Sequence, residues 1–187
     1  MKKEYLTYLK EALLLNENKP DFYRDNFYYN VKDIFNCYAY AMGFKLPKEY
    51  ISKYNGKNRN RGEDTVKFKP GFTCKETRHY NSSTELIEHF CLDCDSLELP
   101  IKKSNIYDKN RTDGYRVALY CNYICDEIFD FHFVRQNKDL SWSHKTGYID
   151  EPKKINITSF LKTDKALPEY KLVGCYEVCK PYTLVKR

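Results

Sequence analysis

The chain has 187 residues, of which 42% are hydrophobic and 16% aromatic, and its 32 basic and 26 acidic residues give a net charge of +6. This composition predicts one domain over residues 1–187 with an aromatic-rich core. The excess charge is too small to indicate a nucleic-acid-binding protein, and no segment has the apolar length of a signal peptide or a membrane span. We therefore expect a cytoplasmic protein with no membrane partner, whose eight cysteines are reduced.

Hydrophobic periodicity predicts helices in the first half of the chain. Apolar positions near helical spacing indicate a helix over residues 3–16, and residues 1–30 as a whole comprise this helix and an aromatic lead-in. Residues 44–70 are polar and rich in Lys, Asn, Gly and Arg, which predicts a long exposed loop. Ser82 and Glu85 have capping-box spacing and open a further helix.

Strand patterns fill the second half of the chain. Runs of β-branched and aromatic residues between turn signals predict four strands, over residues 115–123, 128–136, 141–146 and 170–178. Helices followed by strands predict an α+β fold with an antiparallel sheet.

A short helix is predicted over residues 36–43, NCYAYAMG, with Cys37 in its first turn and Gly43 at a left-handed stop. A thiol in the first turn faces backbone N–H groups and the positive end of the helix dipole. These groups favour the thiolate, which is the nucleophilic form of cysteine. The alternative is that Cys37 is a small buried hydrophobic residue, as most free cysteines are.

The predicted hairpin over residues 128–146 offers a base for this cysteine. If Gln136 pairs with Leu140 around a three-residue loop, His132 lies directly opposite His144 on one face of the hairpin. One ring then takes the thiol proton and the other holds it in the required tautomer. The prediction depends on the loop length, because a shift of one residue moves every side chain to the other face.

Three motifs resemble papain-fold cysteine hydrolases of the NlpC and CHAP kind, including phage and bacterial proteins. They are NCYAYA at residues 36–41, DFHFVRQ at residues 130–136 and WSHK at residues 142–145. The resemblance implies a single papain-like domain in which N-terminal helices pack on a twisted antiparallel sheet. It also implies a peptidase or amidase that forms an acyl-enzyme on a peptide or protein substrate, cell-wall peptide among them, without a metal or cofactor.

The resemblance assigns roles to individual residues. Cys37 is the nucleophile, His132 the general base and His144 the orienting residue. Asp130 or Asn122 are alternatives for the orienting role, in which case the second histidine lies on the substrate side. The candidates for oxyanion or substrate-side residues are Asn36, Tyr29 and Trp142.

Two other classes of function stay open. One is a non-catalytic or host-directed binding protein on the same fold, for example a phage-encoded inhibitor with a host-protein target, which would act in the host cytoplasm. The other is a small zinc-binding module, because Cys91-x-x-Cys94 has zinc-ligand spacing and His89 lies just before it. No phosphate-binding or dinucleotide-binding motif is present, and nucleic acid is not an expected partner.

Overall fold

The structure is a computed structural model. It describes residues 3–15, 20–22, 35–45, 68–74, 79–108, 113–147, 150–160 and 170–179. The helices are α1 (Lys3–Leu15), α3 (Cys37–Met42) and α5 (Ser83–Ser96), and the strands are β1 (Ile101–Lys103), β2 (Tyr115–Ile124), β3 (Glu127–Gln136), β4 (Trp142–His144), β5 (Lys153–Ile155) and β6 (Lys171–Val178). The fold is therefore mixed α+β, as the sequence predicts.

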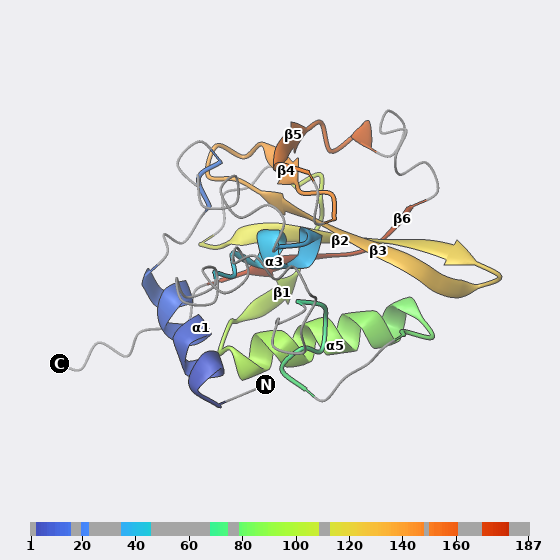
Figure 1. The fold of residues 1–187 in the computed structure, drawn as a ribbon. Coiled ribbons are helices and arrows are strands. Elements are labelled where there is room, and N and C mark those ends of the chain that lie inside the picture. Colours follow the sequence, from blue (N-terminus) through green and yellow to red (C-terminus); the bar gives the residue numbers. More distant parts are fainter. Residues whose placement is uncertain are drawn as a thin grey trace, which may run out of the picture.

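The six strands form one sheet with the order β1-β6-β2-β3-β4-β5. Every pair of neighbouring strands is antiparallel. Figure 1 shows β2 and β3 as a long twisted hairpin that projects beyond the other strands. The four predicted strands are all present, and β1 and β5 are two further ones that the sequence pattern did not predict. Each has three residues, two of them exposed lysines, which leaves no alternation to detect.

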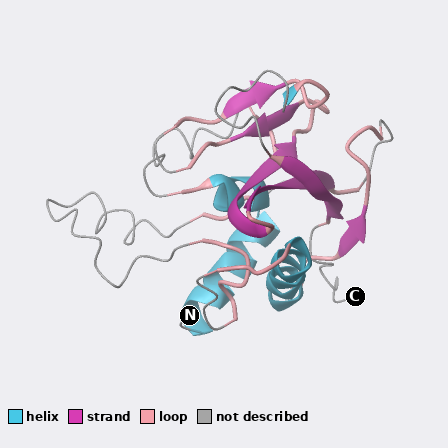
Figure 2. Ribbon diagram, turned by 90° about the vertical axis from the view of Figure 1, so that its right-hand side faces the viewer, coloured by secondary structure: helices cyan, strands magenta, loops and turns pink. Residues whose placement is uncertain are grey.

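The two faces of the sheet carry different side chains because residues alternate along each strand. On one face, Phe133 of β3 contacts Tyr38 of α3 and Phe90 of α5, with ring centroids 4.8 and 6.0 Å apart. Apart from one short helical piece beside the upper strands, the helices lie on one side of the strands in Figure 2. The opposite face carries His132 and Tyr120, which pair across β2 and β3, and a smaller apolar cluster.

The predicted exposed loop over residues 44–70 is wrong at its ends. Phe44 and Phe68 are buried, and their ring centroids lie 5.2 Å apart. Phe35 stacks on Phe68 from the residue before the helix cap, at 5.6 Å. The prediction was based on the average polarity of residues 44–70. This average hides Phe44 and Phe68, which lie near its two ends and belong to the core. Residues 46–67 lie outside the described residues.

The predicted register of the β3–β4 hairpin is also wrong, by two residues. Gln136 pairs with Trp142, and Val134 pairs with His144, around a loop of five residues. The longer loop forms because the Asn137 N–H donates to the Ser141 carbonyl at 2.7 Å, and Leu140 takes a positive φ of 65°. A two-residue shift preserves the face of every side chain.

All eight cysteines of the chain are described, and each is a free thiol.

None of the described helices combines the length and the apolar character that crossing a membrane requires.

Candidate active site

Helix α3 places Cys37 at its first residue. The Asn36 side chain caps the helix, because its Oδ1 accepts a hydrogen bond from the Ala39 N–H at 3.0 Å. Gly43 closes the other end in the left-handed conformation, with φ of 71°. Both ends of this helix match the sequence prediction, because both are fixed by local residue types.

The thiol of Cys37 lies against the backbone of β3 on both sides of His132. Its Sγ is 3.9 Å from the carbonyl oxygen of Phe131, and it also receives a backbone hydrogen bond from Phe133. Among the described strands, β4 pairs with β3 only at residues 134–136. The thiol therefore lies beside a part of β3 that β4 does not pair with. No hydrogen bond joins it directly to His132 within the described residues.

Burial controls the protonation of this thiol. Only 6% of Cys37 is exposed, and desolvation raises the pKa of the thiol from its ordinary 9.0 to about 12. The backbone hydrogen bond from Phe133 and the charge of Lys145 act to lower the pKa, whereas the charge of Asp130 raises it further. Desolvation therefore outweighs the backbone hydrogen bonds that favour the thiolate, and the burial of Cys37 matches the alternative expectation of a small buried residue.

His132 and His144 form a hydrogen-bonded pair. His132 Nε2 and His144 Nδ1 are 2.9 Å apart, and the two rings are nearly perpendicular, with an interplanar angle of 82°. The residues are diagonal in the register, yet their rings still meet because both lie on the same face. Burial, together with the His144 ring, lowers the pKa of His132 from 6.5 to about 3.

Two aromatic residues enclose the histidine pair. Phe160 contacts the rings of His144 and His132, with centroid distances of 4.9 and 6.0 Å, and the Tyr170 ring lies 6.4 Å from His132. Sequence reasoning assigned neither residue to the site, because Phe160 lies outside every predicted element and Tyr170 was predicted only as the first residue of the last strand.

The alternative orienting residues have other contacts. Asp130 accepts hydrogen bonds from the Tyr170 hydroxyl and from the Phe131 N–H. Asn122 pairs with Asp130 across the strands, and its buried Oδ1 has no partner among the described residues. Of the three candidates, His144 is the one whose ring hydrogen-bonds to His132.

The remaining predicted site residues differ in placement. The Asn36 amide is engaged at both ends, because its Nδ2 also donates to the Phe68 carbonyl, and these bonds stabilise α3. Tyr29 lies outside the described residues. Trp142 is buried on the same face as His144 and lines a cavity. The backbone hydrogen-bond donors to the thiol are those of Phe133 in β3 and Tyr38 in the first turn of α3.

Lys145 is a residue near the site to which the sequence assigned no role. It follows His144 and is fully buried, and its Nζ donates to the Gly147 carbonyl at 2.7 Å. Val134 pairs with His144, so the next pair in the same register is Phe133 with Lys145. Lys145 therefore lies opposite the residue of β3 that hydrogen-bonds to the thiol. The WSHK motif contains this lysine, but only the fold shows that it alternates with His144 and faces α3.

The other cysteine motif lies on α5. Cys94 is buried in the core and Cys91 is partly exposed, while the His89 ring lies 5.6 Å from the Tyr80 ring. Among the described residues no three His, Cys, Asp or Glu side chains are grouped so as to hold a metal ion.

Comparison of the chain with protein-family models, curated proteins and solved structures finds no match.

Proposed function

We propose that the protein is a thiol-dependent hydrolase of peptide or amide bonds, with Cys37 as nucleophile, His132 as general base and His144 as orienting residue. The proposal includes a papain-like arrangement in which α3 packs on the β3–β4 edge of the sheet. The observation that supports it best is the 2.9 Å contact between His132 Nε2 and His144 Nδ1, next to the strand edge that holds the thiol.

The hydrogen bond between the rings determines which nitrogen serves as the base. When His132 carries its proton on Nε2 and donates it to His144 Nδ1, the lone pair of His132 Nδ1 is left to accept the thiol proton. His144 then acts as the aspartate or asparagine does in other triads, by fixing tautomer and ring orientation.

The pKa values imply a reaction that starts from neutral groups. At neutral pH both the Cys37 thiol and the His132 imidazole are uncharged. Proton transfer from Sγ to Nδ1 therefore accompanies attack on the substrate carbonyl, as in serine hydrolases. The C–N bond breaks when the imidazolium returns the proton to the leaving amine, and water then hydrolyses the thioester.

The first test is hydrolysis of a panel of fluorogenic peptide amides by the wild type and by variants. Cys37→Ala should abolish turnover, and His132→Ala should lower kcat by about 10²–10⁴-fold. Cys121→Ala is the matched control, because Cys121 is also buried and burial also raises its pKa to about 12, yet it is assigned no chemistry. The control should retain full activity.

A second readout does not require the correct leaving group. A peptidyl acyloxymethyl ketone should alkylate Cys37, which peptide mass spectrometry locates. A wild-type protein that cleaves no peptide amide and forms no Cys37 adduct would contradict the hydrolase proposal.

A binding protein without catalysis is the second candidate. The observation in its favour is that Cys37 has the burial and the raised pKa of an ordinary core thiol, as Cys121 has. On this reading Cys37→Ala changes neither partner binding nor any activity.

A further inference from the structure

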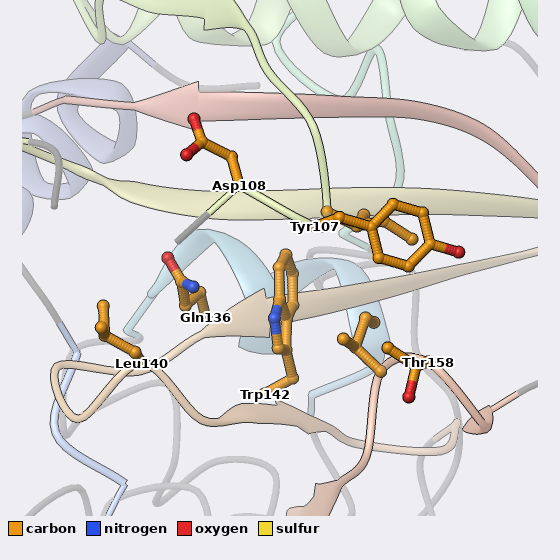
Figure 3. A pocket seen from close by; sticks show the side chains of 8 residues that line it. Tyr107, Asp108, Gln136, Leu140, Trp142 and Thr158 are labelled. Atoms are coloured by element: carbon orange, nitrogen blue, oxygen red, sulfur yellow. The ribbon is translucent and has the colours of Figure 1, made fainter. Parts of the chain in front are cut away.

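A cavity of about 410 Å³ lies on the face of the sheet that carries the two histidines. Three segments line it: the turn after β1, the β3–β4 hairpin and the segment after β5. The lining residues are Ile106, Tyr107, Asp108, Gln136, Leu140, Trp142, Ile157 and Thr158. Figure 3 shows the Trp142 ring at its centre, with Tyr107 on one side and Gln136 on the other.

One end of the cavity is polar and is organised by a buried arginine. Arg116 donates to Gln136 Oε1 at 3.1 Å and forms an ion pair with Asp108 Oδ2 at 3.2 Å. Because the amide oxygen of Gln136 is engaged by Arg116, its Nε2 is the group that can donate to a ligand. Figure 3 places this nitrogen on the side of Trp142.

The cavity adjoins the candidate active site. Trp142 and His144 are two residues apart on β4, so they lie on the same face about 7 Å from each other along the strand. Phe160, which contacts both histidine rings, belongs to the same segment as Ile157 and Thr158. This segment therefore borders both the cavity and the histidine pair.

We propose that this cavity binds a large apolar side chain of the peptide substrate together with the peptide unit that carries it. The proposal rests on the proposed hydrolase function. The apolar walls fit an aliphatic or aromatic group, and the volume is in the range of ligand pockets. The peptide carbonyl accepts from Gln136 Nε2, and the peptide N–H donates to the Asp108 carboxylate. A charged side chain would lose its hydration against these apolar walls.

The cavity contains its own reporter, because Trp142 is the only tryptophan in the chain. The test follows the emission of Trp142 during titration with acetylated dipeptide amides that carry Phe, Leu, Gly, Lys or Glu. Phe and Leu amides should give saturable changes with at least tenfold lower Kd than the Gly, Lys and Glu amides. Equal responses to all five would overturn the proposal.

Two threonine variants distinguish a block of the cavity from the effect of adding a phenylalanine elsewhere on the protein surface. Thr158→Phe places a ring at the exposed rim of the cavity and should abolish the response to the Phe amide. Thr7→Phe, at an exposed position of α1, should leave it unchanged. Loss of the response in both variants, or in neither, would overturn the assignment.

A third measurement links the cavity to the thiol. Acyloxymethyl ketones with Phe should alkylate Cys37 at least tenfold faster than those with Gly, and Thr158→Phe should remove this preference. Alkylation of Cys37 at equal rates would overturn the subsite and leave the hydrolase proposal standing. No alkylation by any ketone, with Phe-amide binding intact, would overturn the hydrolase proposal and with it the assignment of the cavity as a substrate subsite.

Discussion

At the scale of single residues, two effects act on the Cys37 thiol in opposite directions. The helix end and the backbone hydrogen bonds from Phe133 and Tyr38 favour the thiolate, and desolvation disfavours it. Desolvation is the larger effect, so the Cys37 thiol and the His132 imidazole are both neutral in the folded protein at neutral pH. In the proposed hydrolase, proton transfer from the thiol would therefore accompany attack on a bound substrate.

The labelling order of the cysteines tests this conclusion. Iodoacetamide at pH 7 should modify the exposed Cys74 and Cys125 first, and Cys37 at least about tenfold more slowly, because alkylation needs both access and thiolate. Peptide mass spectrometry over a time course gives the three rates. Modification of Cys37 ahead of the two exposed thiols would mean that the thiolate exists before substrate binds.

The residues of the site divide into those that local sequence can identify and those that it cannot. Cys37 at a helix start and the two histidines of one hairpin were predictable, because helix caps and strand alternation are local properties. The pKa of Cys37 and the burial of Lys145 were not, because both result from segments distant in sequence that exclude water from the strand edge.

At the scale of elements, α3 is a six-residue helix that depends on its caps. A helix this short has little intrinsic stability. The Asn36 side chain supplies the N-cap and also bonds to the Phe68 carbonyl, and Gly43 supplies the left-handed residue at the other end. The first-turn N–H groups keep their orientation toward the thiol only while these caps hold.

Substitution of either cap should therefore destabilise the protein. Asn36→Ala should lower the free energy of unfolding by about 1 kcal/mol through loss of the N-cap. Gly43→Ala should cost about 1 kcal/mol through left-handed strain alone, because no atom lies within 4 Å of the added Cβ. Urea denaturation measures both effects.

Conservative variants serve as controls for the caps. Asn36→Ser keeps an oxygen that caps the helix without placing a carboxylate against the Phe68 carbonyl, and Gly43→Asn places a residue that tolerates the left-handed region. Each should lose less stability than the corresponding alanine variant. Equal losses would mean that the caps are not what stabilises α3.

The β3–β4 hairpin shows why an element can be predicted while its register is not. The strands have clear alternation, but the loop is closed by tertiary contacts. Asn137 Oδ1 accepts from the Ser143 hydroxyl, which is itself 2.7 Å from the Tyr40 hydroxyl of α3, and the Lys138 N–H donates to the Pro20 carbonyl. Tyr40 and Pro20 lie more than 100 residues from the hairpin in sequence, beyond the reach of any turn rule.

At the scale of the whole molecule, burial of His132 couples folding to pH. The ordinary pKa of 6.5 applies to the unfolded chain, and the folded value is about 3. Between these values the unfolded state binds a proton that the folded state does not, so protonation favours unfolding. His132 therefore does not change the free energy of unfolding above pH 6.5, and it lowers this free energy increasingly as the pH falls toward 3.

The free energy of unfolding should therefore decrease by up to about 1.4 kcal/mol per pH unit below pH 6.5 on account of this residue. Urea denaturation at pH 7, 6 and 5 measures the slope. His132→Asn should reduce the slope, whereas His79→Ala, at an exposed histidine, should leave it unchanged. An unaltered slope in His132→Asn would show that His132 is not the group responsible.

The strand order has a consequence for biosynthesis. Strand β6 is the last described strand to be made, yet it pairs between β1 and β2 in the interior of the sheet. Until residue 178 has left the ribosome, the apolar edge of β2 at residues 117–121 has no partner on that side. Unpaired apolar edges associate with other chains, and pairings this distant in sequence form slowly. The nascent protein is thus most prone to aggregation during the interval before β6 has been synthesised, and this interval is where a chaperone would have most effect.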